Sequence, residues 1–159
     1  MDLTLPLDHA AIERILPHRY PFLLVDRIVE FEADKRIVGI KNVSLNDRYL
    51  SPATAGGMPA MPNTILTEAV AQVGAIMILA KPENQQSLVL FGGIQRVRYR
   101  RAVHPGDVVV IEAEVLRLRR SMGKFRGVAR VDGRIVLEGT MTFALSPAQA
   151  APVSGSGRS

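Results

Sequence analysis

The chain of 159 residues has the length of one domain, and 47% hydrophobic residues are enough to fill one core. It contains no cysteine, which excludes a disulfide framework, a thiolate nucleophile and any metal site with cysteine ligands. The net charge of +5 attracts an acidic partner, but aromatic residues make up only 5% and no nucleic-acid-binding motif is present. We therefore expect no nucleic acid. An acidic carrier protein, a phosphorylated cofactor and a solvated basic surface all remain open.

The N-terminal region carries acidic residues and prolines where a secretory signal needs a basic start and an apolar run, so a cytoplasmic protein is expected. The longest apolar stretch, from Val70 to Ala80, is interrupted by Gln72 and is too short to cross a bilayer. We expect no membrane span.

The first elements are a short helix and a pair of strands. Asp8 to Leu16 has the spacing of an amphipathic helix, which Pro17 ends. Two apolar segments, Phe22 to Phe31 and Arg36 to Ser44, flank a polar turn and predict a β-hairpin. The glycines and prolines from Asn46 to Asn63 then predict a long functional loop.

A second helix is predicted after this loop, capped by Asn63 or Thr64. Its apolar residues surround most of the helix axis, which is typical of a buried helix. The rest of the chain predicts strands over Ser87–Ile94, Val97–Val103, Val108–Arg119, Gly123–Val131 and Arg134–Leu145. We therefore predict an α+β fold in which a long antiparallel sheet curls around one helix.

The domain is expected to span residues 1–145. The last segment, residues 146–159, is small, rich in Pro, Gly and Ser, and has no apolar period, so it is expected to be a disordered tail.

Glu68 is the principal candidate for chemistry, because a carboxyl group among apolar helix residues is costly to bury without a function. A structural alternative is a capping box, in which Glu68 bonds back to Asn63 or Thr64. Gln72 lies four residues later on the same helix face and can orient the carboxyl group or a substrate carbonyl, or make a polar contact between subunits. The free amides at Asn63 and Thr64 can polarise a carbonyl oxygen.

The three histidines have ordinary interpretations. His9 is expected on the surface, His18 as a structural hydrogen-bonding residue, and His104 exposed before a turn. None of them has metal-ligand spacing, so no metal is expected. The sequence also has no Walker or dinucleotide glycine loop, so no resident cofactor is expected, and a phosphorylated cofactor remains open only as a partner of the basic surface.

Several motifs resemble the 3-hydroxyacyl-[acyl-carrier-protein] dehydratases of fatty-acid synthesis, over residues 10 to 145. They are Leu16-Pro17-His18-Arg19-Tyr20-Pro21-Phe22-Leu23-Leu24-Val25-Asp26-Arg27, Lys41-Asn42-Val43-Ser44 with Asn46, Glu68-Ala69-Val70-Ala71-Gln72, Phe91-Gly92-Gly93-Ile94, Arg101 with Val103, and Pro105-Gly106-Asp107. The resemblance implies a hotdog fold, homodimers with acyl tunnels between subunits, and trimers of such dimers.

In that family a histidine of a Gly-His-Phe-Pro loop removes the C2 proton, and the helix glutamate protonates the departing hydroxyl group. A backbone amide at a Pro-Gly helix start holds the thioester oxygen. Glu68 and Pro62 match this pattern, with Asn63 in place of the glycine. Ala53, Thr54 and Ala55 stand where Gly-His-Phe would fall, so this loop has no imidazole.

The resemblance implies a thioester substrate on acyl carrier protein or coenzyme A, with Glu68 catalytic and Asn63, Thr64, Gln72 and Gly93 in substrate binding. Three hypotheses follow. The protein is a dehydratase with altered or reduced chemistry, an acyl-thioester hydrolase that uses Glu68, or a non-catalytic acyl-binding or partner subunit.

Overall fold

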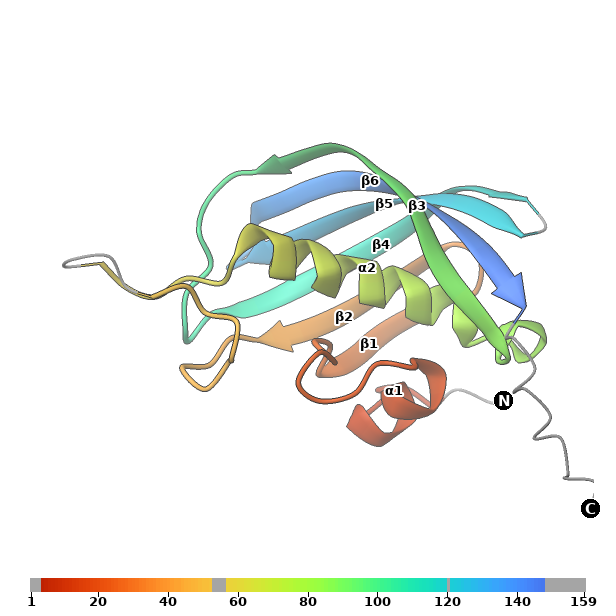
Figure 1. The fold of residues 1–159 in the computed structure, drawn as a ribbon, viewed down its shortest axis with the longest axis horizontal. Helices are drawn as coiled ribbons and strands as arrows, with labels where there is room; N and C mark the ends of the chain where they lie inside the picture. The colour runs from red at the N-terminus through yellow and green to blue at the C-terminus, as the bar shows by residue number, and fades with distance from the viewer. Residues whose placement is uncertain (1–3, 53–56, 120, 148–159) are drawn as a thin grey trace, which may run out of the picture.

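The computed structural model describes residues 4–52, 57–119 and 121–147. Its elements, in chain order, are α1 (His9–Ile15), β1 (Arg27–Glu32), β2 (Arg36–Asn42), α2 (Asn63–Leu79), the 3-10 turn η1 (Pro82–Asn84), β3 (Ser87–Tyr99), β4 (Val108–Arg119), β5 (Met122–Val131) and β6 (Arg134–Pro147). The six strands form one antiparallel sheet in the order β1-β2-β4-β5-β6-β3, and α2 lies across its inner face (Figure 1). This arrangement confirms the predicted α+β hotdog fold.

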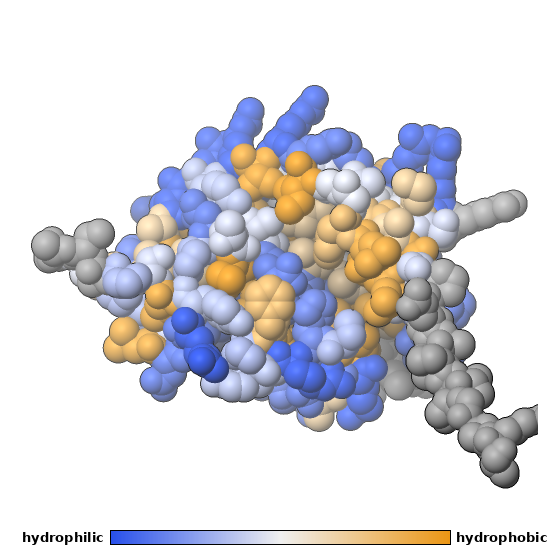
Figure 2. All heavy atoms as spheres, viewed as in Figure 1, coloured by the Kyte–Doolittle hydropathy of each residue, from blue (hydrophilic) through white to orange (hydrophobic). Residues whose placement is uncertain are grey.

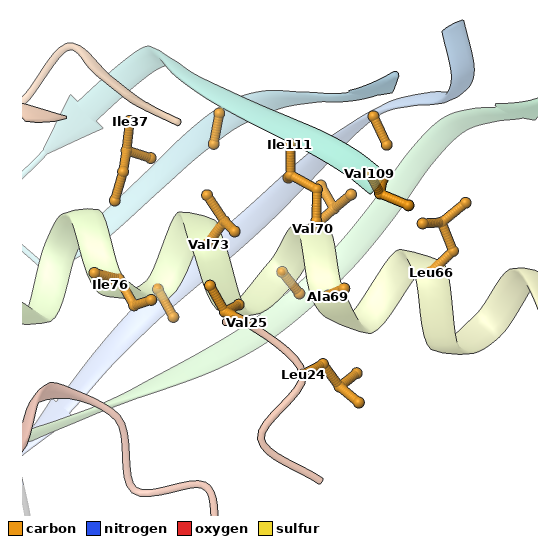
Figure 3. Packing of buried hydrophobic residues seen from close by; sticks show 14 of the residues in the cluster. Leu24, Val25, Ile37, Leu66, Ala69, Val70, Val73, Ile76, Val109 and Ile111 are labelled. Carbon is orange, nitrogen blue, oxygen red and sulfur yellow. The ribbon is translucent and has the colours of Figure 1, made fainter. Parts of the chain in front are cut away.

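The second helix forms the centre of the core. Every residue of α2 from Leu66 to Leu79 is buried except Glu68. Figure 3 shows Val70 and Val73 extending from α2 toward Ile111 and Ile37 of the sheet. In the described part of the chain, no helix is long and apolar enough to cross a membrane.

Glycines let the helix and the sheet approach closely. A methyl group added at Gly74 of α2 would lie 2.3 Å from Cζ of Phe125, and one added at Gly127 of β5 would lie 2.3 Å from Cγ1 of Val70. Both distances are far below van der Waals contact. Helix and sheet therefore fit closely because these two positions have no side chain.

Buried and exposed residues alternate along β4, and this alternation shifts by one residue near its end. Val109, Ile111 and Ala113 are buried as the sequence alternation predicts. An irregularity between Val115 and Arg117 then shifts the register, so Leu118 also packs against the core. A bulge changes which residues face the core.

Several predicted bounds differ from the structure. The chain forms no strand before Arg27, because the backbone at Leu24 bonds to the Gln72 side chain instead of a neighbouring strand. The two segments predicted at Ser87–Ile94 and Val97–Val103 are one strand, which passes through a bulge where Arg96 has φ 54° and ends at Tyr99.

The C-terminal strand is longer than predicted. β6 continues to Pro147, where Pro147 pairs with Ser87 of β3. The remainder of the predicted tail lies outside the described residues.

Candidate active site

Glu68 lies in the second turn of α2, with 27% of its side chain exposed. Gln72, one turn later, donates from Nε2 to Oε1 of Glu68 at 3.1 Å. The same amide donates to the carbonyl of Phe22 at 2.7 Å and accepts from the backbone N–H of Leu24 at 2.9 Å. Gln72 is thus fully bonded and buried, and it connects the carboxyl group to the segment before β1.

His18 is the second polar neighbour of Glu68. Its Nε2 lies 3.6 Å from Oε1 of Glu68, and its ring packs against Phe22 at a centroid distance of 6.1 Å. The sequence predicted that His18 forms a structural hydrogen bond. This prediction is wrong for Nδ1, which is buried without a partner among the described residues. No local sequence pattern connects His18 with Glu68, because the two residues are far apart along the chain.

A groove of about 260 Å³ opens beside the Glu68 carboxyl group. Its walls come from α2 and from β3, and the lining residues are Thr64, Thr67, Glu68, Ala71, Phe91, Ile94 and Tyr99. The Tyr99 hydroxyl lies 2.8 Å from Oγ1 of Thr67, which donates to the carbonyl of Asn63 at 2.8 Å. The groove combines an apolar wall with one carboxyl group.

The groove lies on a face where apolar side chains gather over β3 (Figure 2). The exposed apolar residues of this strand are Leu88, Leu90, Phe91, Ile94 and Tyr99. Because β3 ends the sheet, its outer edge has no strand partner among the described residues. Such an apolar sheet edge is typical of a surface that pairs with another chain.

The start of α2 differs from the predicted cap. The helix begins at Asn63, with Pro62 as the cap residue, and no side chain caps it, so the prediction of Asn63 or Thr64 as the cap is wrong. Pro62 has φ −58° and ψ 139°, so it is extended and lies just outside the helix. Glu68 bonds to Gln72 instead of the helix start, so the capping-box alternative does not apply.

The remaining predicted site residues occupy different surroundings. Gly93 lies in β3 at an irregular pairing with β6, between the groove residues Phe91 and Ile94, with no atom within 4 Å of an added methyl group. Thr64 lines the groove, whereas Asn63 contributes its carbonyl to Thr67. Ala53, Thr54 and Ala55 lie outside the described residues.

The other two histidines lie away from the groove lining. His9 is exposed, as expected, and its Nε2 lies 3.4 Å from Glu13 on α1. His104 is half-buried, so the expectation that it is exposed is wrong. Its Nδ1 forms a hydrogen bond with the carbonyl oxygen of Pro59 at 2.9 Å. Its backbone N–H also donates to Asp107 at 2.9 Å.

Arginines gather around a second hollow, of about 210 Å³, that includes Arg96, Arg98 and Arg126 together with Glu138. The hydrogen bond from Arg100, with the charges of the neighbouring arginines, holds the pKa of Glu138 below its ordinary value. Glu138 therefore stays ionised and neutralises part of this basic surface. The sequence showed the arginines but not their arrangement around one acid.

Comparison with known proteins gives consistent results. The model of the FabA-like domain matches residues 16–140. The 3-hydroxyacyl-[acyl-carrier-protein] dehydratase FabZ of Moorella thermoacetica is 51% identical over 139 residues, which are 87% of this chain and 96% of that protein. The FabZ of Bacillus licheniformis is 47% identical over 143 residues, 90% of this chain and 99% of that one.

Solved structures share the fold at lower identity. The dehydratase heterocomplex ApeI:P of Xenorhabdus doucetiae has a TM-score of 0.74 at 21% identity, covering 91% of this chain and 93% of that chain. A mutant thioesterase of Pseudomonas aeruginosa has a TM-score of 0.67 at 15% identity, covering 89% and 95%. By its motifs, its fold and its identity to the FabZ proteins, this chain belongs to the 3-hydroxyacyl-[acyl-carrier-protein] dehydratase family.

Proposed function

We propose that the protein dehydrates 3-hydroxyacyl thioesters to enoyl thioesters, with Glu68 as the group that protonates the departing hydroxyl. The observation that carries this proposal is the position of the Glu68 carboxyl group beside a mainly apolar groove, where Gln72 holds it. Family membership supports the same reaction.

The reaction itself needs little beyond proton transfer. The C2–H bond and the C3–O bond break, the C2=C3 double bond forms, and the hydroxyl group leaves as water. Glu68 supplies the proton to the hydroxyl oxygen, and a second group or a water molecule accepts the proton from C2. The thioester oxygen faces the first amides of α2, which lack helical acceptors.

The chemistry is altered relative to the family pattern. No histidine stands between Asn46 and Pro62, and a positioned general base contributes about 10²–10⁴-fold to a rate. We therefore expect slower dehydration than a family member that has the loop imidazole.

The proposed assembly is a homodimer joined along β3, with a trimer of such dimers as the larger form. The exposed apolar side chains of β3 and its open edge support pairing with a second copy. A second chain against β3 would also cover the groove, whose wall includes Phe91 and Ile94 of that strand. Sedimentation or light scattering of the purified protein tests the assembly.

The proposed substrate carrier is acyl carrier protein, with coenzyme A as the alternative. The arginines around Glu138 and the net charge of +5 favour an acidic partner. If the carrier binds through this surface, raising the salt concentration increases KM for the carrier-linked substrate more than for the coenzyme A thioester.

The test of the function follows two products at once. The purified protein is incubated with 3-hydroxyacyl and with saturated acyl thioesters, and enoyl formation and thiol release are measured for the wild type and for Glu68→Gln. Loss of enoyl formation in Glu68→Gln, by about 10²–10⁴-fold, supports the proposal. Glu83→Gln, which changes an exposed acid near the other end of α2, is the matched control.

Other outcomes select the alternatives. Thiol release that depends on Glu68 would identify a thioesterase, which needs only one carboxyl group and helix amides. If neither the enoyl thioester nor the free thiol forms with substrates of any acyl chain length, the protein is instead an acyl-binding or partner subunit.

A further inference from the structure

The His18 imidazole is a partly buried titratable group that the proposed reaction does not use. Only its Nδ1, among the side-chain nitrogens and oxygens of the described residues, is buried without a hydrogen-bond partner. Its other nitrogen, Nε2, faces Oε1 of Glu68 at 3.6 Å. An imidazole in such a place is either a proton carrier or a support for the carboxyl group.

His18 does not contribute to the groove lining, whereas Glu68 does. Gln72 Nε2 donates to the same oxygen, Oε1, that His18 approaches. Two nitrogen groups thus converge on one carboxyl oxygen, and the second oxygen accepts no hydrogen bond from the described residues, which leaves it available to a substrate.

The Arg19 side chain uses the backbone acceptors next to the ring. The Arg19 guanidinium donates to the carbonyls of Leu16 and of His18 itself, at 2.8 and 2.7 Å. These bonds occupy nearby acceptors and place a positive charge beside the histidine backbone. An N–H at Nδ1 would have no acceptor among the described residues, whereas an N–H at Nε2 faces Oε1 of Glu68.

We propose that His18 is a positioning residue for Glu68. With a proton on Nε2, it directs this N–H at Oε1 and, together with Gln72, keeps the carboxyl group turned toward the groove. The distance of 3.6 Å is longer than a hydrogen bond, and the contact shortens when substrate fixes the carboxyl group. This inference rests on the proposed function of Glu68.

The test compares two substitutions at one position. In His18→Leu the N–H is lost, and kcat for enoyl formation should fall by about 10–100-fold with KM nearly unchanged, because Glu68 loses its alignment. In His18→Gln an uncharged amide N–H can reach the same oxygen, so kcat should return to near the wild-type value. Thermal unfolding of each variant shows whether the fold is retained.

Two kinetic outcomes overturn the proposal. If His18→Gln is as slow as His18→Leu, the imidazole itself transfers a proton. If His18→Leu keeps the wild-type kcat, the contact has no role in the reaction. His9→Leu is the matched control, because it removes an exposed histidine that lies 3.4 Å from Glu13 of α1 and does not approach Glu68.

A second measurement needs no turnover. Long-range ¹H–¹⁵N NMR correlations of the imidazole report which ring nitrogen carries a proton. We expect a proton on Nε2 of His18 and ring signals that move in Glu68→Gln. A ring whose only proton is on Nδ1, or ring signals that do not move in Glu68→Gln, overturns the inference even in an active enzyme. If the wild type forms no enoyl product, only the proposed function is overturned. The NMR measurement still shows whether His18 directs its N–H at Glu68.

Discussion

The side of α2 that faces the sheet and the side that carries Glu68 are packed in different ways. Toward the sheet, contacts are apolar and close, as where Phe125 lies over Gly74 and Val70 lies over Gly127. On the other side, Gln72 bonds to the backbone of Phe22 and Leu24 and to the Glu68 carboxyl group. Packing on the side that faces the sheet depends on the fit of apolar side chains, and packing on the Glu68 side depends on a few directed hydrogen bonds. Stability and the geometry of the site should therefore respond to different substitutions.

The largest effect on stability is expected on the sheet side, from Ile111→Ala. Ile111 is fully buried in β4 and points toward α2 (Figure 3), so its truncation leaves a cavity and should lower the free energy of unfolding by about 2–5 kcal/mol. Urea unfolding measures this change. The kcat of the folded fraction should stay constant, because Ile111 does not line the groove. A parallel fall in kcat would show that the two sides are not independent.

Gln72→Leu should affect both properties. Leucine has a similar volume but leaves the N–H of Leu24 and the carbonyl of Phe22 without their partner, at a cost of about 1–3 kcal/mol in unfolding free energy. It also frees the Glu68 carboxyl group, so kcat should fall. Denaturation and enoyl formation are measured on the same sample, with the exposed Gln86→Leu as the control. An unchanged kcat would contradict the orienting role of Gln72.

The smallest effect is expected on the outer face of the sheet, from Glu112→Gln. The hydrogen bond from Arg36, with a further contribution from Arg130, holds the pKa of Glu112 below its ordinary value of 4.5, although partial burial opposes this. A lowered pKa in the folded state stabilises the protein above the unfolded pKa, and this stabilisation is lost as the pH falls through the folded value. We expect less than about 1 kcal/mol at neutral pH.

Acid unfolding measures this pH dependence. The difference in unfolding free energy between wild type and Glu112→Gln should shrink as the pH falls below about 4.5. The exposed Glu114→Gln on the same strand is the control. A difference that grows toward acid pH would refute the assigned direction of the shift.

The sequence by itself determined much of the fold. The predicted bounds of β4 match the structure, and those of β5 and β6 each differ at one end only. These strands could be predicted because the alternation of apolar residues and the Asp132-Gly133 turn depend only on residues close together in the chain. The buried helix and its single carboxyl group were also evident, since Glu68 is the only ionisable residue of α2. The catalytic role of Glu68 remains a prediction.

Only the tertiary structure decided how distant segments meet. The backbone at Leu24 is not a strand, because it bonds to Gln72, which lies 48 residues later. His18 approaches Glu68, and Tyr99 reaches Thr67 of α2, through contacts between segments that no local pattern connects. Local periodicity depends on neighbours along the chain, whereas the surroundings of a carboxyl group depend on which segments the packed core brings together.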